Sequence, residues 1–329
     1  MMPFVSALLV TRNEEMFIEK ALLSLINQTY PKDCYEIIVI DGESDDNTLE
    51  NINNLIQKYK TDTFDIRCIN NPKKILAAGW NLGIKNAKGE YVVRIDAHSE
   101  AARDFIQKSV ETISSIPDVV CVGGKLTTRS LDGDNNIVSK VLSSPFGVGN
   151  STFRISDKPG YADTAVYGLY KKSIFEEIGY FNEQYVRNQD IELHSRIRNK
   201  GGKFYFNPEV NCIYYSRNTV KKMLNQAEGN GKWNMILLKN HSSAVRLRHL
   251  VPFAFVLYLF CSLMAGYFFN IFWVLEFFVL FLHLTMGFIA AGKKTRKLSE
   301  LLQMPVLFLL LHLSYGIGYL KGIFIKINK

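Results

Sequence analysis

Short apolar runs alternate with amphipathic stretches in the first hundred residues of the chain. Runs such as 4–10 and 36–40 are almost continuously apolar, which is typical of strands buried on both faces of a sheet. Between them, apolar residues recur every three or four positions, which is typical of helices with one buried face. The pattern predicts strands and helices in alternation, at 4–10, 15–26, 36–40, 49–59, 66–69, 76–87 and 91–95. This order with short connections predicts an α/β fold with a parallel sheet.

The last quarter of the chain contains three much longer apolar segments, at 250–269, 271–291 and 304–323. About 20 apolar residues in a helix span the core of a bilayer. The first segment has no charged residue, and the third contains His312 as its ionisable group before Lys321. These segments predict a C-terminal domain of transmembrane helices and therefore a multi-pass membrane protein.

The net charge of +8 is distributed unevenly along the chain. Residues 239–329 hold ten Lys and Arg against two Glu, so the remainder of the chain is formally neutral. A basic nucleic-acid-binding domain would carry the surplus on its folded, mixed-polarity part, so the pattern predicts no nucleic-acid partner. Basic residues beside apolar helices instead predict contact with anionic membrane lipids.

The basic stretches also predict an orientation in the membrane. Residues 246–249 and 293–297 flank the first two apolar segments and should be cytoplasmic, with a short outer turn near Asn270. This arrangement predicts an inner (plasma) membrane protein with a cytoplasmic catalytic domain. A full third span would carry Lys321 to the outside, against the same rule, whereas a re-entrant or interfacial third segment would not. Both alternatives stay open.

Polar residues follow the predicted strands at the points where the strands end. In parallel α/β sheets, ligands bind at the carboxyl ends of the strands. Neither a GxGxxG nor a GxxxxGK[ST] motif follows any strand, so a dinucleotide-binding or P-loop site has no support. The polar residues at the predicted strand ends are Thr11, Asn13, Glu14, Asp41, Asp96 and His98.

Four stretches in this order resemble a family 2 glycosyltransferase with the GT-A fold, over about residues 4–235. They are Val-Thr-Arg-Asn-Glu at 10–14, the acidic turn at 39–48, the run from Asn81 into Arg-Ile-Asp-Ala-His at 94–98, and Gln-Asp-Ile-Glu-Leu at 189–193. Two variants, His98 at the end of the DxD element and Gln189 before Asp190, are similar to the succinoglycan-type glucosyltransferase branch. That branch also has a membrane-embedded C-terminus.

The resemblance implies roles for individual residues. Asp96 and His98 would hold a divalent metal, Mn²⁺ or Mg²⁺, and Asp190 would be the catalytic base. His98 stands where the family has a carboxylate, and a neutral imidazole can bind Mn²⁺. The residues that the resemblance assigns to the nucleotide sugar are Thr11, Asn13, Glu14, Asp41, Asn81 and Asp96.

Each assignment has a plainer alternative. Asp190 immediately precedes the predicted helix 191–199 and could be an N-cap. Asp41 could open a turn, and Glu14 could be a first-turn helix acid. His98 could be a surface or core histidine.

Residues near the membrane domain form a second group of candidates. Arg217, Lys232 and Trp233 could contact the diphosphate or the acceptor, close to where processive relatives have a Q/RxxRW element. Most of that element is missing, which argues against a processive synthase. A solvated basic surface is the alternative.

Together these observations predict a GT-A domain at 1–238, with a nucleotide-sugar-binding half at 1–100 and an acceptor half at 101–238, followed by a membrane domain at 239–329. The predicted enzyme is an inverting hexosyltransferase that moves a sugar from a nucleoside diphosphate sugar, a UDP-sugar being favoured, to a lipid-linked saccharide in cell-surface polysaccharide synthesis. A polyprenyl-phosphate glycosyltransferase and a non-catalytic membrane scaffold with a degenerate transferase domain are the alternatives.

Overall fold

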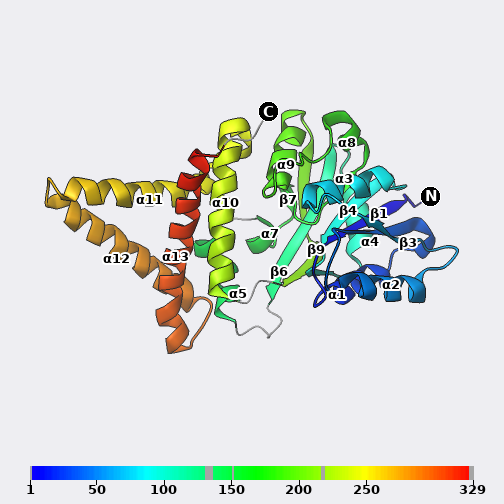
Figure 1. The fold of residues 1–329 in the computed structure, drawn as a ribbon, viewed down its shortest axis with the longest axis horizontal. Coiled ribbons are helices and arrows are strands. Elements are labelled where there is room, and N and C mark those ends of the chain that lie inside the picture. Colours follow the sequence, from blue (N-terminus) through cyan, green and yellow to red (C-terminus); the bar gives the residue numbers. More distant parts are fainter. Residues whose placement is uncertain (1, 130–135, 150–151, 216–218, 326–329) are drawn as a thin grey trace. The chain divides into compact units, whose positions relative to one another are not determined.

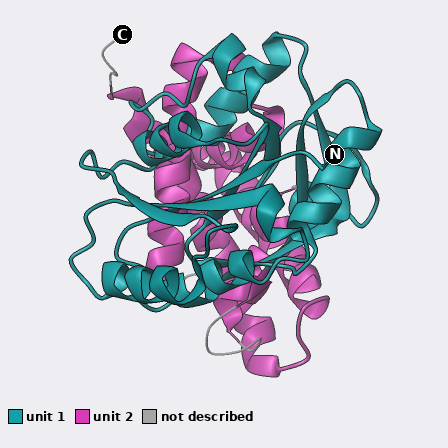
Figure 2. Ribbon diagram, turned by 90° about the vertical axis from the view of Figure 1, so that its right-hand side faces the viewer, with its two compact units in different colours: residues 1–127, 152–215 teal, residues 128–151, 216–329 magenta. Residues whose placement is uncertain are grey.

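The structure is a computed structural model that describes residues 2–129, 136–149, 152–215 and 219–325. The chain forms two compact units, coloured separately in Figure 2. The first unit comprises residues 1–127 and 152–215, and the second comprises residues 128–151 and 216–329. The second unit begins earlier in the chain than the membrane domain predicted at 239–329, because a long helix at 220–240 packs lengthwise on the last helix.

A mixed sheet forms the centre of the first unit, with strand order β3-β2-β1-β4-β8-β6-β9-β5 and β7 paired to β9. The first four strands are parallel and the other pairings that the structure records are antiparallel. The register aligns Thr11 with Asp41, and Val10 with Asp96, so these strand ends lie at one edge of the sheet. The strands are β1 (Val5–Thr11), β2 (Tyr35–Asp41), β3 (Ile66–Asn70), β4 (Tyr91–Asp96), β5 (Ser99–Ala101), β6 (Val119–Arg129), β7 (Gly160–Ala162), β8 (Leu169–Lys171) and β9 (Lys203–Tyr215).

Helices cover both faces of this sheet (Figure 1). On β1, Val5, Ala7 and Leu9 pack with helices α1, α2 and α4, whereas Leu8 and Val10 pack with α3, α8 and α9. Burial on both faces explains why the strands read as continuous apolar runs. The helices of the first unit are α1 (Ile18–Ile26), η1 (Lys32–Cys34), α2 (Thr48–Tyr59), α3 (Leu76–Asn86), α4 (Phe105–Ser115), α7 (Thr152–Ile155), α8 (Ser173–Ile178) and α9 (Gln189–Asn199).

The alternation of strands and helices predicted for residues 4–95 is confirmed. Each of the seven predicted elements is present, and their ends differ by at most three residues. The largest difference is at α1, which begins at Ile18 rather than at Glu15. The residues before it form a turn, in which the Glu14 carbonyl accepts hydrogen bonds from the backbone N–H groups of Phe17 and Ile18.

The second unit is helical. Three of its helices are long and apolar enough to cross a membrane, with mean hydropathies of 1.8, 2.1 and 1.6 in chain order. The third of these is one unbroken helix that begins six residues before the predicted segment 304–323. The helices are α5 (Ile137–Leu142), α6 (Pro145–Val148), α10 (Val220–Asn240), η2 (Ser242–Ala244), α11 (Leu247–Gly266), α12 (Ile271–Gly292) and α13 (Leu298–Ile323).

Candidate functional site

The loops that follow the four parallel strands surround one pocket of about 210 Å³. Three of these loops contain a non-glycine residue with a left-handed backbone: Asn13, Glu43 and Lys74, at φ of 54°, 53° and 58°. Such conformations cost about 1–3 kcal/mol each and occur most often at functional sites. The polar lining includes Thr11, Arg12, Glu14, Lys74, Asp96 and His98, so four of the residues predicted from the strand ends meet here.

Asp96 is the last residue of β4, and its oxygen Oδ1 is buried with no hydrogen-bond partner among the described residues. Two other residues that line the same pocket contain such an atom, Oγ1 of Thr11 and Oδ1 of Asn71. Leaving a buried polar atom unpaired costs about 1–3 kcal/mol. Three such atoms in one place indicate a pocket that is completed by a polar ligand.

His98 supplies an imidazole beside the Asp96 carboxylate. Its Nδ1 lies 3.3 Å from Oε1 of Glu14, and its ring packs edge-on against Tyr214 at 5.2 Å between centroids. In the described ranges, no cluster of three or more His, Cys, Asp or Glu could hold a metal by itself. Divalent ions at phosphate sites take one or two protein ligands and the rest from phosphate and water. The unpaired Asp96 oxygen therefore fits an ion that binds together with a diphosphate.

Arg94 was not predicted as a site residue. It lies in the interior of β4, and its guanidinium is held between two aromatic rings, 4.9 Å from the centroid of Trp80 and 5.3 Å from that of Phe181. The residue is 92% buried, and neither Nε nor Nη1 has a hydrogen-bond partner in the described part of the chain. A single charged residue inside an otherwise apolar strand was the signal in the sequence.

Arg94 interacts electrostatically with two predicted site residues, the metal ligand Asp96 and the catalytic base Asp190. Burial acts to lower the pKa of the Arg94 guanidinium, but the neighbouring Tyr170, Asp190 and Asp96 outweigh it, and the pKa is raised above its ordinary value. Asp96 ends β4 and Asp190 lies in α9, almost one hundred residues later. Both carboxylates interact with one guanidinium on the same face of the sheet.

Asp190 is the second residue of α9, and the N-cap position belongs to Asn188, which has a left-handed backbone at φ 58°. The N-cap alternative for Asp190 is therefore wrong. Its Oδ1 accepts a hydrogen bond of 2.9 Å from the backbone N–H of Ile191, and its side chain is partly exposed.

Asn13 lies in the loop after β1, and Asp41 is the last residue of β2; the side chains of both accept hydrogen bonds from the loop after β2. The Asp41 carboxylate accepts hydrogen bonds from Oγ and the backbone N–H of Ser44, at 2.6 and 3.0 Å. The Asn13 side chain accepts one from the N–H of Asp45 at 3.0 Å. Carboxylate and amide oxygens have further lone pairs, so nucleoside contacts through these two residues stay a prediction.

Asn81 lies outside the pocket lining, at the junction of α3 with the loop before α9. Its amide exchanges two hydrogen bonds of 2.9 Å with the backbone of Phe181 and donates a third, of 3.0 Å, to Glu183. Glu183 also pairs with Lys73 at 2.6 Å. The structure therefore uses Asn81 to hold this loop, and its predicted contact with the nucleotide sugar has no counterpart in these hydrogen bonds.

The remaining candidates do not belong to the described part of the first unit. Arg217 lies outside the described residues. Lys232 and Trp233 lie on α10 in the second unit. Their predicted contacts with diphosphate or acceptor stay a prediction.

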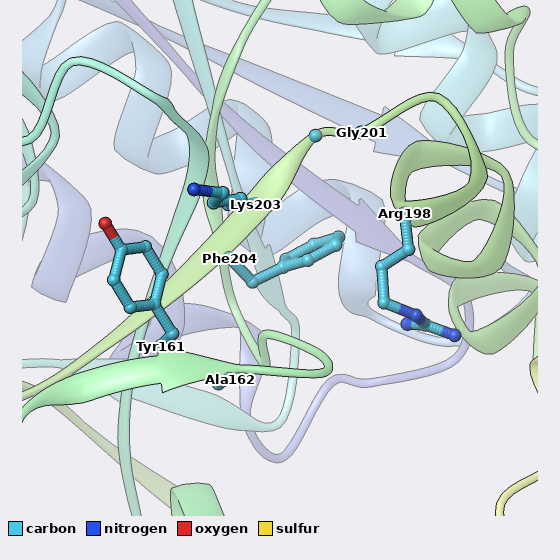
Figure 3. A pocket seen from close by; sticks show the side chains of 7 residues that line it. Tyr161, Ala162, Arg198, Gly201, Lys203 and Phe204 are labelled. Atoms are coloured by element: carbon cyan, nitrogen blue, oxygen red, sulfur yellow. The ribbon is translucent and has the colours of Figure 1, made fainter.

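A second, larger pocket of about 370 Å³ lies at the opposite end of β9 (Figure 3). Its Lys203 begins β9, whereas the backbone N–H of Tyr215 at the other end donates to the carbonyl of His98. A strand of this length covers about 40 Å. Both cations that line this pocket already have partners: Lys203 pairs with Asp118 at 2.5 Å, and Arg198 donates a hydrogen bond to the carbonyl of Asp163. None of its lining residues has a buried side-chain atom without a partner among the described residues.

The mixed α/β sheet with this strand order, and the acids at the ends of its parallel strands, are the arrangement expected of a GT-A fold. Residues 6–179 match the model of Glycosyl transferase family 2, and the chain belongs to this family. The resemblance predicted from the four sequence stretches is confirmed, and so are the fold and the glycosyltransferase class.

Individual relatives cover most of the chain. It is 30% identical over 98% of both chains to a dolichyl N-acetyl-α-D-glucosaminyl phosphate 3-β-D-2,3-diacetamido-2,3-dideoxy-β-D-glucuronosyltransferase of Methanococcus voltae. It is 25% identical to the succinoglycan biosynthesis protein ExoA of Rhizobium meliloti, over 77% of this chain and 76% of the relative. The solved mannosyltransferase PcManGT of Pyrobaculum calidifontis, in complex with GDP-Man and Mn²⁺, is 18% identical with a TM-score of 0.63, over 96% of this chain and 87% of that one.

Proposed function

We propose that this enzyme is an inverting glycosyltransferase that moves a sugar from a nucleoside diphosphate sugar to a lipid-linked saccharide. The observation that carries the proposal is the buried, unpaired carboxylate oxygen of Asp96 in the pocket at the strand ends. The name of the Methanococcus voltae relative describes an acceptor sugar joined to dolichyl phosphate, which supports a lipid-linked acceptor. The succinoglycan relative supports a role in polysaccharide synthesis.

Asp96 and His98 would hold a divalent cation, Mn²⁺ or Mg²⁺, together with the diphosphate. When bound, this ion would neutralise the negative charge that develops on the leaving diphosphate. The solved mannosyltransferase with GDP-Man and Mn²⁺ supports this choice of ion. Thr11 and Glu14 line the same pocket and would contact the nucleotide, for which we propose a UDP-sugar.

Asp190 would act as the general base. A glycosyl acceptor is an alcohol, so its proton must leave as its oxygen attacks the anomeric carbon, and a carboxylate within hydrogen-bond reach can accept it. One base on the face opposite the leaving group produces inversion of the anomeric centre, by the geometry that applies to inverting glycosidases. The positive charge of Arg94 would attract this carboxylate towards β4, the strand that ends in Asp96.

The membrane helices would keep the active site close to its lipid-linked acceptor. Basic residues lie at the start of α11, at Arg246 and Arg248, and follow α12 at Lys293 and Lys294. By the positive-inside rule, these residues favour the cytoplasmic face of the inner (plasma) membrane for the transferase.

The test uses full-length protein in lipid nanodiscs with Mn²⁺, a panel of nucleotide sugars and lipid-linked saccharides, and product detection by mass. Asp190→Asn should reduce turnover by about 10²–10⁴, the usual contribution of a general base. Asp96→Asn should remove most activity at low Mn²⁺ and raise the Mn²⁺ concentration needed for half-maximal rate. The exposed Asp62→Asn is the matched control and should leave the rate unchanged.

Full transfer by both Asp96→Asn and Asp190→Asn would contradict the proposal. Transfer to polyprenyl phosphate itself would survive Asp190→Asn, because a phosphate oxyanion is already deprotonated. A non-catalytic scaffold would hydrolyse no donor at any Mn²⁺ concentration.

A further inference from the structure

Helix α13 is longer and less apolar than α11 and α12, and a polar helix runs along it. An added Cβ at Gly231 of α10 would lie 1.9 Å from the carbonyl oxygen of Tyr315, and one at Gly318 of α13 would lie 2.1 Å from that of Glu228. At Gly322 the corresponding distance, to the carbonyl oxygen of Lys232, is 2.5 Å. The two backbones therefore touch over about two turns, and α10 and α13 can only enter a membrane together.

Helix α10 carries charges that oppose such insertion. Glu228 pairs with Lys321 of α13 at 2.7 Å, and Lys239 donates a hydrogen bond of 3.0 Å to the carbonyl of Gly322. A charged residue at the centre of a bilayer costs at least about 2.5–3.5 kcal/mol, and α10 carries Glu228 and Lys232 near its middle. Inserting the C-terminal half of α13 into the hydrocarbon would therefore carry these charges of α10 with it.

The first turn of α13 is also tied to a polar partner. Its Glu300 pairs with Lys140 of α5 at 2.7 Å, and both side chains are at least 85% buried. The two ion pairs, at Glu300 and at Lys321, are separated by 21 residues, or about 31 Å along a helix. Both ends of α13 are therefore bound to polar elements of the same unit.

The lipid-accessible surface of α13 is a single stripe. Its exposed large apolar residues are Leu298, Leu302, Val306, Leu310, Ile317 and Ile323. Most of these lie four or seven residues apart, on one face of the helix. Its other faces pack on α10, α5, α11 and α12. A single lipid-accessible apolar stripe is typical of a helix that lies in the membrane interface.

Helices α11 and α12 differ from α13 in their packing, because each contacts α13 over only part of its length. They contact α13 through the first half of α11 and the second half of α12: Pro252 and Val256 of α11 lie against Gly316, and His283 of α12 hydrogen-bonds His312 at 2.9 Å. Farther out, the two helices pack on each other, as at Gly266 and Trp273.

Figure 1 shows α11 and α12 leaving α13 and converging on a shared turn. That turn exposes Tyr267, Phe268 and Phe269, each by more than 60%. Each helix has at least 20 residues, enough to cross a bilayer core.

We propose that α11 and α12 cross the bilayer as a hairpin, while α13 lies in the interface on the side of α10 with its apolar stripe against the lipid. The partner is an anionic bilayer surface. Arg246, Lys293, Lys294 and Lys321 then all meet the headgroups of one leaflet, which is the arrangement that the positive-inside rule favours. The aromatic turn reaches the other leaflet, where Tyr and Trp are enriched.

Single cysteines in full-length protein test the topology. The background has the five native cysteines replaced by alanine and is first checked for retained transferase activity. Lys222→Cys on α10, Asn270→Cys in the turn and Phe324→Cys after α13 are then labelled in sealed vesicles with a membrane-impermeant maleimide. Cysteines at 222 and 324 should react from one side and the cysteine at 270 from the other. Reaction at 324 from the side of 270, or at 270 from the side of 222, would overturn the proposal.

Depth measurements test the position of α13 independently. Spin labels at Leu302, Val306 and Leu310, in vesicles containing anionic lipid, should report one shallow depth, while a label at Phe278 of α12 should be deep. A spanning helix would instead change depth by up to about 12 Å between 302 and 310. Such a gradient would overturn the interfacial position even if the labelling pattern were retained.

Discussion

Arg94 and Asp96 are separated by one residue on β4, so their side chains leave the strand on the same face of the sheet. That face is covered by α3, α8 and α9, and α9 carries Asp190. The buried guanidinium interacts with both carboxylates, and both act to raise its pKa. A buried residue of β4 therefore interacts electrostatically with both the acid at the end of β4 and the acid at the start of α9.

Replacing Arg94 with methionine should damage both stability and turnover. The change removes the electrostatic attraction between the guanidinium and the two acids. It also removes the cation–π contacts with Trp80 and Phe181, and such a contact contributes about 2 kcal/mol when it is desolvated. Arg94→Lys should recover part of the stability but less of the turnover, because an ammonium does not stack as a guanidinium does between Trp80 and Phe181. Thermal unfolding and kcat/KM measure the two effects. The exposed Arg103→Met is the control, and equal behaviour of the variants at 94 and 103 would contradict the assignment.

Asn81→Ala should destabilise the first unit without changing the KM for the donor. The change removes three hydrogen bonds and leaves backbone groups of Phe181 unpaired, at a cost of about 1–3 kcal/mol. Asn86→Ala, at the exposed end of the same helix, should shift the unfolding temperature far less. A large rise in donor KM with unchanged stability would instead support direct nucleotide contact by Asn81.

Gly231→Ala should weaken the packing of α10 on α13. The new methyl group would overlap the carbonyl of Tyr315, and overpacking a tight contact typically costs about 1–3 kcal/mol. Gly292→Ala is the matched control, because an added Cβ at Gly292 has no neighbour within 4 Å. The measurement is thermal unfolding in nanodiscs. A variant at 231 as stable as the variant at 292 would show that the two helices are not in backbone contact.

His194 should make the stability of the transferase depend on pH between about 5 and 6.5. Burial, together with the charges of Arg94 and Arg198, holds the pKa of its imidazole well below the ordinary 6.5. Each ring nitrogen forms a hydrogen bond of 2.7 Å with a hydroxyl group, one with that of Thr164 and the other with that of Tyr170. Below pH 6.5 the unfolded chain binds a proton that the folded chain excludes, so stability falls as pH falls. The slope for one such group approaches about 1.4 kcal/mol per pH unit.

The control for this pH dependence is His194→Gln, which retains a polar side chain but does not titrate. Its stability should change less between pH 7 and pH 5 than that of the parent enzyme. Carboxylates with a lowered pKa, such as Glu183, lose their contribution below about pH 4.5 and do not act in this window. Parallel pH profiles for the two proteins would show that His194 is protonated in the folded state.

The sequence predicted the parallel half of the sheet because strands buried on both faces read as apolar runs and the helices between them have a clear period. It did not predict that β8 pairs with both β4 and β6, because these partners lie far away in the sequence. The β4–β8 pairing joins residues about eighty apart, and the β6–β8 pairing joins residues about fifty apart. The pocket residues Thr11, Glu14, Asp96 and His98 were predictable because strand ends meet at one edge of a sheet. Asn81 was assigned to the nucleotide sugar, but its hydrogen bonds are with a loop one hundred residues later.

Local patterns in the sequence by themselves determined the α/β alternation, the polar strand ends and the three apolar segments. Only the tertiary structure showed that Arg94 lies near both Asp96 and Asp190, because that proximity depends on α9 folding back onto β4. Only the tertiary structure likewise distinguishes α13 from α11 and α12, because a charged helix packs along α13. The hydropathy of a segment depends on its own residues and contains no information on the helices that pack against it. In the structure, Gly231, Gly318 and Gly322 allow the charged helix α10 to make backbone contact with α13. The free energy of inserting a helix depends on every group that must enter the bilayer with it.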